Sequence, residues 1–381
     1  MKQKNTMNSI WNIDWFASIQ PGRSYLILRN HGGKYWVLPE TQLRMGMELY
    51  QPTTNKGKLI KLLYPMMHKF ALLNAMLQID MVNIHFSPLV KWVGEVCFHT
   101  TLLPAFYFLD SPIESNHKLT AQFSNGKKIL GYGKFTDSPN VAEAFRREGD
   151  ILAQLKFAGV DNVPTCLACG EENGVYYFAQ TTQKTAGAKN ITKFLPEHEA
   201  FLTELYKKTG VAMGFRHSYE YSLLEALAGY LEADCEHDST LLQKMLRKIE
   251  KKAEAVVTHL CCGHNDFTPW NTYWTEGNLQ VFDFEYAQMN CVPYLDAFHY
   301  WLQPLILDQK RSPEEIMRNL TELKSLPLSD GMQLEEWFAL YLLKIIAFHY
   351  RRNDGKFDWN DWCYEIWRQL LSKIDNVLRL T

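Results

Sequence analysis

Alternating apolar and polar residues predict three pairs of antiparallel strands in the first half of the chain. Each pair is separated by a short polar turn, which is typical of β-hairpins. The first turn is Asn-His-Gly-Gly at residues 30–33, and the second is Ser-Asn-Gly at residues 124–126. The paired runs stand at residues 24–29 and 34–39, 118–123 and 127–135, and 163–170 and 174–182.

Apolar residues at three- and four-residue spacing predict that the second half is mainly helical. The helical runs cover residues 218–233, 239–257, 334–350 and 362–378. Ser239 and Thr240 are placed to cap the second of these helices. A further helix is predicted to begin at residues 137–139, and the apolar region after residue 39 is expected to be helical as well.

A fourth hairpin is predicted between the helices, and polar residues stand at both of its ends. Residues 272–274 and 279–282 flank a turn that contains Gly277. Asn271 immediately precedes this hairpin and Asp283 immediately follows it, so the two side chains are expected to lie close together. Asp266 stands five residues before Asn271.

This arrangement predicts a phosphoryl-transfer site, in which a hydroxyl is positioned against a metal-bound triphosphate. Asp266 would accept the proton of the substrate hydroxyl. Asn271 and Asp283 offer the oxygen ligands that Mg²⁺ prefers. His264 is expected to brace the loop by hydrogen bonding. Taken alone, the His-x-Asp sequence is equally well explained as a turn with a satisfied histidine.

These motifs resemble those of the aminoglycoside phosphotransferase and choline kinase superfamily. The resemblance rests on His264-x-Asp266-x-x-x-x-Asn271 and on Asp283-Phe284-Glu285. It implies an α+β, bilobal protein-kinase-like fold, with ATP and Mg²⁺ as cofactors. Asp266 would be the catalytic base, and Asn271 and Asp283 would be the metal ligands.

The same resemblance implies an ATP-binding part upstream. Lys134 on the strand at residues 127–135 would contact the phosphates, held by Glu148 on the next helix, with Glu143 as the alternative partner. Taken alone, these residues are also explained as surface charges. Residues 180–182, Gln180, Thr181 and Thr182, would form the nucleotide hinge. The segment 110–117, where a glycine-rich loop would cover the phosphates, contains no glycine, so none of its residues is assigned.

The resemblance also implies a division of the chain. Residues 1–102 would be an additional α+β region that recognises a partner or substrate or supports the small lobe. Residues 103–183 would be the small lobe, and residues 184–381 the helical lobe. Asp296 would brace the catalytic loop. His299 is expected in the core, with a position facing the acceptor as the alternative.

Composition limits the partners. The chain has 381 residues, 46% of them hydrophobic, and a formal net charge of −2, which gives no general attraction to nucleic acid. The longest apolar region, residues 59–81, is interrupted by charged and polar residues and cannot span a bilayer. Lys56, Lys58 and Lys61 lie beside apolar residues there; an internal packing helix is expected, with docking on a membrane surface as the alternative.

The cysteines indicate no disulfide framework. There are eight, without a regular spacing, and the N-terminus is polar, so a reducing cytoplasmic location is expected. Cys166 and Cys169 have the spacing of a zinc or redox pair, but a second pair at matching distance is missing. We therefore interpret them as ordinary structural residues.

The acceptor is expected to be a hydroxyl of a small molecule or glycan. An aromatic cage for a choline-like cation could use Trp270, Tyr286, Trp301, Trp337, Trp362 and Trp367, although packing explains them equally well. An aminoglycoside could be attracted by Glu220, Glu225, Glu232, Asp234 and Glu236, although a solvated helix face is favoured. A sugar acceptor has no signature to look for.

The rival function is a catalytically inactive protein that binds a nucleotide or a partner. A protein kinase is disfavoured by Glu285 in place of glycine.

Overall fold

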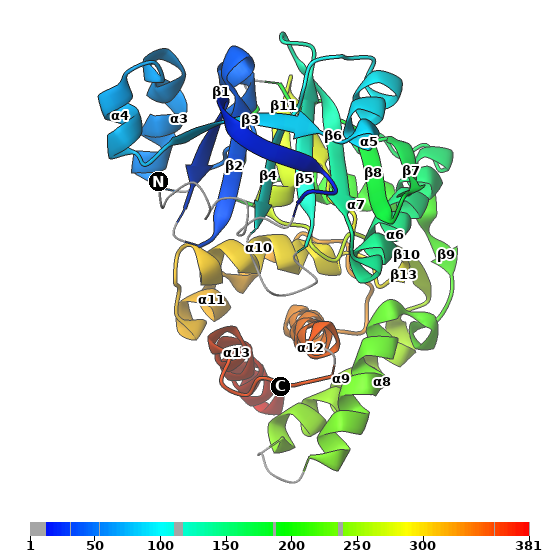
Figure 1. Ribbon diagram of the computed structural model, residues 1–381. Coiled ribbons are helices and arrows are strands. Elements are labelled where there is room, and N and C mark those ends of the chain that lie inside the picture. The colour runs from blue at the N-terminus through cyan, green and yellow to red at the C-terminus, as the bar shows by residue number, and fades with distance from the viewer. Residues whose placement is uncertain are drawn as a thin grey trace. The chain divides into compact units, whose positions relative to one another are not determined.

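The computed structural model describes residues 13–30, 32–52, 54–109, 117–185, 188–234, 239–353 and 355–380. The chain divides into two compact units. The first contains residues 1–153 and 163–188 and is built on a sheet, and the second contains residues 154–162 and 189–381 and is mainly helical (Figure 1). The predicted α+β fold class is confirmed.

The sheet of the first unit is antiparallel between all its neighbouring strands, in the order β3-β1-β2-β4-β5-β6-β8-β7. All three hairpins predicted in this part of the chain are confirmed, as β1–β2, β5–β6 and β7–β8. Because β2 pairs with β4, the first hundred residues extend the same sheet that carries the predicted small lobe. The strands are β1 (Ala17–Arg29), β2 (Lys34–Pro39), β3 (Asp80–Phe86), β4 (Ala105–Leu109), β5 (Leu119–Ser124), β6 (Ile129–Thr136), β7 (Cys166–Glu172) and β8 (Val175–Thr181).

An aromatic core fixes one face of this sheet. The Phe16 ring lies 5.1 Å from the rings of Phe106 and Phe135 and 5.5 Å from that of Phe86, centroid to centroid. Such edge-to-face pairs add to the stabilisation from burial alone. At Gly131 a Cβ atom would lie 2.1 Å from the carbonyl oxygen of Gln180, so glycine is required where β6 approaches β8.

The helices of the first unit are mostly short, apart from α3 and α6. They are a 3₁₀ turn (Glu40–Gln42), α2 (Leu43–Gly46), α3 (Asn55–Met67), α4 (Ala71–Met76), α5 (Pro88–Trp92), a π turn (Val93–Cys97) and α6 (Pro139–Phe157), whose end from residue 154 on belongs to the second unit. The helix predicted to begin near residue 139 is confirmed as α6. The region after residue 39 is only partly helical, because it also contains β3 and β4. The expectation that α3 is packed internally is wrong for one of its faces, where Leu59 and Leu62 are exposed.

One helix of the second unit, α12, is buried along its middle. In α12 every residue from Glu336 to Ala347 is buried. The four predicted helices are confirmed as α8, α9, α12 and α13, but Ser239 makes no side-chain cap hydrogen bond to α9. The helices are α7 (Pro196–Thr209), α8 (Tyr219–Ala233), α9 (Thr240–Val256), α10 (Leu295–Leu307), α11 (Pro313–Asn319), α12 (Leu334–Arg352) and α13 (Trp362–Leu380), with 3₁₀ turns at Phe215–His217, Pro269–Asn271 and Leu320–Leu323.

Short strands of the second unit frame one loop. β10 (His259–Gly263) pairs with β13 (Gln288–Cys291) on one side and with β9 (Val211–Ala212) on the other. The predicted fourth hairpin is confirmed as β11 (Thr272–Thr275) paired with β12 (Asn278–Val281). Among the described residues, no helix is long and apolar enough to cross a membrane.

Candidate active site

The loop between β10 and β11 carries the predicted catalytic residues. A backbone hydrogen bond connects the last residue of this loop to the segment that follows the β11–β12 hairpin: the Phe282 N–H donates to the carbonyl oxygen of Asn271 at 3.1 Å. The backbone of Asn271 is therefore paired with the residue that precedes Asp283, and a shared metal site for their two side chains stays a prediction. Asp283 adopts a left-handed backbone conformation with φ 69°. Backbone conformations of this kind cluster at functional sites.

Asp266 presents a carboxylate from an otherwise buried loop. Its side chain is 31% exposed, whereas those of His264, Phe267 and Thr268 are fully buried. The Asn271 Nδ2 donates to Asp266 Oδ2 at 2.8 Å and to the Asp266 carbonyl oxygen at 3.0 Å. The carboxylate is thus accessible and held in place by a neighbour that does not neutralise it.

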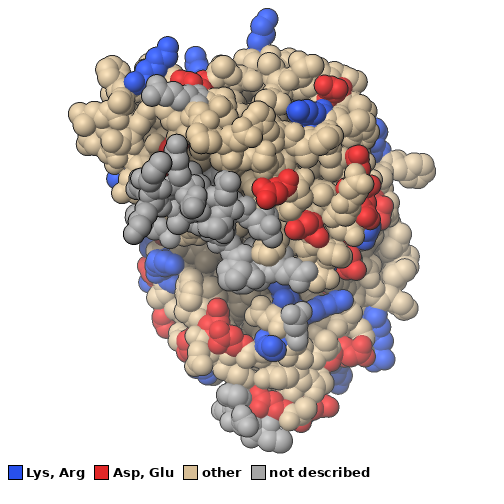
Figure 2. Space-filling model, viewed as in Figure 1, with Lys and Arg blue, Asp and Glu red and all other residues tan. Residues whose placement is uncertain are grey.

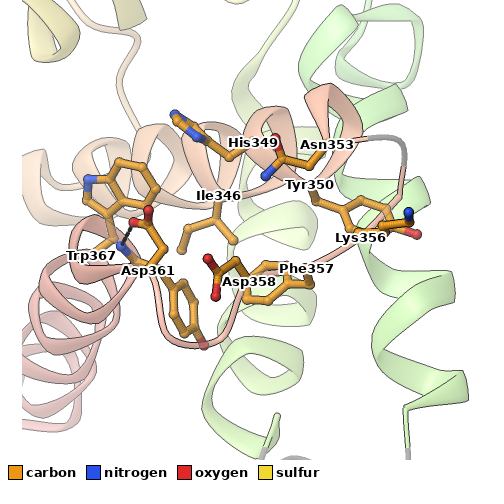
Figure 3. A pocket seen from close by; sticks show the side chains of 10 residues that line it. Ile346, His349, Tyr350, Asn353, Lys356, Phe357, Asp358, Asp361 and Trp367 are labelled. Carbon is orange, nitrogen blue, oxygen red and sulfur yellow. Dashed lines mark hydrogen bonds between the residues drawn. The ribbon is translucent and has the colours of Figure 1, made fainter. Parts of the chain in front are cut away.

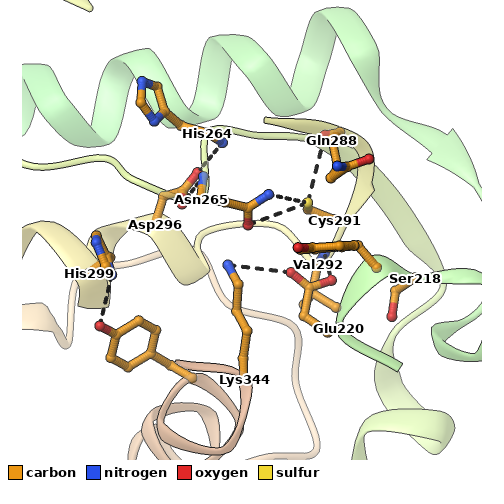
Figure 4. Close-up of polar contacts among 12 residues, drawn as sticks. Ser218, Glu220, His264, Asn265, Gln288, Cys291, Val292, Asp296, His299 and Lys344 are labelled. Atoms are coloured by element: carbon orange, nitrogen blue, oxygen red, sulfur yellow. Dashed lines mark hydrogen bonds and ion pairs between the residues drawn. The ribbon is translucent and has the colours of Figure 1, made fainter. Parts of the chain in front are cut away.

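Two residues brace this loop, as the sequence predicted. Asp296 on α10 accepts from the backbone N–H of His264 at 2.6 Å and of Asn265 at 3.0 Å (Figure 4). His264 Nδ1 accepts from the Asp266 N–H at 3.2 Å, which leaves the ring proton on Nε2 to donate to the Phe282 carbonyl at 3.0 Å. The bracing roles of Asp296 and His264 are therefore confirmed.

A buried polar network lies beside these braces (Figure 4). Glu220 on α8 accepts from the Val292 N–H at 2.9 Å, and Lys344 on α12 lies 3.6 Å from Glu220. Burial alone would lower the pKa of Lys344, but the attraction of Glu220 and Asp296 outweighs it and raises that pKa above its ordinary value. Glu220 is therefore not part of a solvated acidic face, and Glu236 lies outside the described residues.

His299 is buried, which confirms its expected place in the core, and it also contacts the predicted base. Its Nε2 lies 3.4 Å from Asp266 Oδ1, and its Nδ1 lies 3.0 Å from the Tyr341 hydroxyl. With Asp266 ionised, the ring proton belongs on Nε2, so that Tyr341 donates to Nδ1. The signal in the sequence was the position of His299 three residues after Asp296, which places both on one face of α10.

We expect His299→Gln to lower kcat by about tenfold to a hundredfold, the equivalent of one hydrogen bond to a charged group. The KM for ATP should change little, since His299 orients Asp266 and belongs to a different unit from Lys134. Steady-state kinetics would test this, with the acceptor that the labelling assay described under Proposed function identifies. Asp308→Asn, at the exposed end of the same helix, is the matched control and should leave kcat unchanged; equal losses in both variants would contradict a specific role for His299.

A further carboxylate, that of Glu285, lies beside the predicted Mg²⁺ ligand Asp283, and no role was predicted for it from the sequence. Carboxylate oxygens of Asp283 and Glu285 lie within 4.8 Å of each other. Both hydrogen bonds of Asn271 to Asp266 use its amide nitrogen, so its amide oxygen is the atom suited to a cation. An all-oxygen set with two carboxylates fits a hard divalent cation such as Mg²⁺.

Lys134 and Glu148 form the predicted ion pair in the first unit. Lys134 Nζ lies 2.6 Å from Glu148 Oε2, and both side chains are buried. Lys134 comes from β6 and Glu148 from α6, whereas the alternative partner Glu143 is exposed on the same helix. A buried ion pair requires close geometry to offset its desolvation. The role of this pair toward phosphates stays a prediction.

The predicted nucleotide hinge lies at the end of β8. Gln180 is buried within the sheet between β6 and β7. The Thr181 N–H donates to the Thr165 carbonyl at 3.0 Å, and the Thr181 hydroxyl accepts from the Thr165 N–H at 2.9 Å. The Thr181 N–H is therefore engaged within the sheet and does not face adenine. The predicted phosphate-covering segment lies outside the described residues between 110 and 116.

Cys166 and Cys169 lie on β7 beside a cavity of about 400 Å³ in the first unit. Burial raises the pKa of Cys166 to about 11 and also raises the pKa of Cys169. Both thiols are consequently protonated near neutral pH, which disfavours a redox pair.

His198 packs beneath the catalytic loop and predicts a pH dependence of folding. Burial lowers the pKa of His198 to about 4 from its ordinary value of 6.5. Between pH 6.5 and pH 4, His198 is protonated in the unfolded chain but stays neutral in the folded protein. The contribution of His198 to stability therefore falls as the pH falls from 6.5 toward 4. The expected loss is about 1.4 kcal/mol per pH unit, or about 2 kcal/mol at pH 5.

Urea unfolding of the wild type and of His198→Gln at pH 7 and pH 5 would measure this loss. In the wild type the Leu195 N–H donates to His198 Nδ1 at 2.9 Å. The side-chain oxygen of glutamine can accept the same hydrogen bond. The variant should lose about 2 kcal/mol less than the wild type on acidification. His217→Gln, at an exposed histidine, is the control; an unchanged acid sensitivity in His198→Gln would contradict the assignment.

The aromatic residues considered for a cation cage are mostly parts of the core. Trp301, Trp337 and Trp367 are buried, and Trp362 lies under the Lys310 ammonium at 4.3 Å. A cavity beside Trp367, lined also by His349, Asp358 and Asp361, measures about 60 Å³ (Figure 3). It is several times smaller than sites that enclose a small-molecule ligand, so it does not hold the whole acceptor.

Comparison with known proteins agrees with these motifs. Residues 132–294 match the phosphotransferase enzyme family, APH. All the residues proposed from the sequence as catalytic, nucleotide-binding or metal-binding lie within this segment, from Lys134 to Asp283. The predicted family resemblance is confirmed over the segment, and the match supports a small-molecule phosphotransferase.

Three solved structures are similar to this chain at low sequence identity. Choline kinase LicA from Streptococcus pneumoniae is 16% identical over 68% of this chain and 90% of that chain, with a TM-score of 0.46. An aminoglycoside phosphotransferase APH(4)-Ia mutant in complex with ADP and hygromycin B is 14% identical over 77% and 98%, with a TM-score of 0.46. A putative fructosamine-3-kinase from Haemophilus somnus is 13% identical over 75% and 96%, with a TM-score of 0.45. No curated protein matches the sequence.

Proposed function

We propose that the protein is an ATP- and Mg²⁺-dependent phosphotransferase that phosphorylates a hydroxyl of a small molecule or glycan. The observation that carries the proposal is the Asp266 carboxylate, accessible and oriented by Asn271 at 2.8 Å and His299 at 3.4 Å on a braced loop. Phosphoryl transfer depends mainly on positioning and charge neutralisation, which such a rigid loop serves.

Each residue has a stated part in this reaction. Asp266 takes the proton of the acceptor hydroxyl. At the same time the hydroxyl oxygen of the acceptor bonds to the γ-phosphorus of ATP, and the bond between that phosphorus and the oxygen of the leaving ADP breaks. Asn271 and Asp283, with Glu285 beside them, would hold Mg²⁺, which neutralises the triphosphate charge. Lys134, held by Glu148, would contact the ATP phosphates. Backbone groups around Thr182 would contact adenine.

The rival proposal is a catalytically inactive protein that binds a nucleotide or a partner through the same fold. The presence of Lys134, Asp266, Asn271 and Asp283 together favours the enzyme, because a protein that only binds a nucleotide has no use for the base Asp266. Both proposals place the protein in the reducing cytoplasm, where ATP and Mg²⁺ are supplied.

Transfer of label from γ-labelled ATP would test the proposal. The full-length protein would be incubated with Mg²⁺ and with choline, ethanolamine, aminoglycosides, simple sugars or a metabolite extract. A labelled product supports the proposal and identifies the acceptor class. ATP binding without any labelled product would favour the inactive rival.

A further inference from the structure

The helices α3 and α4 carry an unusual concentration of exposed apolar side chains. Leu62 is 69% exposed and Leu72 is 76% exposed. Of the eighteen large hydrophobic side chains that are exposed among the described residues, seven belong to this hairpin: Leu59, Leu62, Met66, Met67, Phe70, Leu72 and Met76. We refer to these seven residues as the α3–α4 apolar face. Grouped exposed apolar side chains of this kind mark interaction surfaces.

The opposite side of the hairpin is well packed, so this exposure does not result from an unfolded segment. Tyr64 is buried, and its hydroxyl donates to Asn74 Oδ1 at 2.8 Å, which ties α3 to α4. Ile60, Leu73 and Leu77 pack against the core on one face of the sheet. The Thr54 side chain caps α3 by accepting from the Gly57 N–H at 3.1 Å. The hairpin is therefore a folded element with one apolar face directed outward.

The charges of the hairpin all have one sign. Residues 51–79 contain four lysines, Lys56, Lys58, Lys61 and Lys69, and neither aspartate nor glutamate, although the whole chain has a net charge of −2. Lys61 pairs with Glu48 at 3.0 Å, whereas Lys56, Lys58 and Lys69 are exposed. In Figure 2 the surface over α3 and α4, at the upper left, is largely uncharged, with basic and a few acidic side chains beside it.

We propose that the α3–α4 apolar face binds the surface of a membrane that contains anionic phospholipids. Leucine, methionine and phenylalanine side chains would enter the boundary between headgroups and acyl chains, while the lysines remain at the level of the phosphates. The apolar side chains match the acyl-chain region of the bilayer, and the lysines match the negative charge of its headgroups. The inference is independent of the proposed enzymatic function.

Flotation of the full-length protein with lipid vesicles tests this proposal. Vesicles of phosphatidylcholine alone would be compared with vesicles that also contain phosphatidylglycerol. The wild type should float with the anionic vesicles, and Leu62→Ser/Phe70→Ser/Leu72→Ser should reduce the partition coefficient by about tenfold or more. Lys56→Gln/Lys58→Gln/Lys69→Gln should reduce it by up to about fivefold per lysine. Circular dichroism would verify that both variants are folded.

Phe157→Ser is the matched control, because Phe157 is 95% exposed and stands far from the hairpin in the sequence. It should float like the wild type. The proposal is overturned if the wild type floats with neither vesicle, or with both equally. It is also overturned if the serine variant floats like the wild type, or if the face instead mediates self-association in solution without vesicle binding.

Discussion

Asp266→Asn is expected to lower kcat for phosphoryl transfer by about a hundredfold to ten-thousandfold, the range that general-base catalysis contributes. Asparagine has nearly the same shape as aspartate but cannot accept the hydroxyl proton. The KM for ATP should stay within a few fold, because Asp266 is assigned to the acceptor hydroxyl. Steady-state kinetics with the labelled acceptor would measure both parameters.

Asp308→Asn is a suitable control for this variant, since Asp308 is an exposed carboxylate at the end of α10. It should keep the wild-type kcat. If Asp266→Asn retained more than a tenth of the wild-type kcat, Asp266 would not be the base, and the assignment of the whole loop would have to be reconsidered.

The second large effect is expected at the buried ion pair between Lys134 and Glu148. Glu148→Gln removes the buried carboxylate that lies 2.6 Å from the Lys134 ammonium, and breaking a buried ion pair of this kind costs about 3–5 kcal/mol of stability. Urea unfolding would measure the loss. Activity should fall as well, because the Lys134 ammonium would no longer be held in position.

Two further variants separate stability from function at this pair. Lys134→Met/Glu148→Leu removes both charges and should recover most of the stability, while ATP-dependent activity stays lost. Glu143→Gln, at the exposed glutamate of the same helix, should change stability by less than about 0.5 kcal/mol. Recovery of activity in the double variant would contradict the role proposed for Lys134.

The elements of this fold could be predicted best where the apolar residues follow a single spacing, either every second residue as in a strand or every three to four residues as in a helix. The paired strands β5 and β6, the hairpin β11–β12 and the helices α8 and α12 were all anticipated. The residues of the catalytic loop could be assigned because their chemistry depends on short spacings along the chain. The hydrogen bond from the Phe282 N–H to the Asn271 carbonyl shows how the hairpin returns the chain to the catalytic loop.

Other features were missed for identifiable physical reasons. β4 is a continuous apolar run, which has no alternation that would separate it from a buried helix. In α3, apolar residues occur on both sides of the helix, so periodicity could not tell which side packs inward. The contact of His299 with Asp266 depends on how α10 and α12 pack, since Tyr341 holds the other ring nitrogen.

Phosphorus NMR of one reaction mixture tests the central claim most directly. The full-length protein, MgATP and the acceptor found by labelling would be followed over time. The account predicts a phosphomonoester resonance that grows in proportion to ADP and is absent with Asp266→Asn. Formation of ADP with inorganic phosphate alone, or no consumption of ATP, would contradict a phosphotransferase that acts on a hydroxyl.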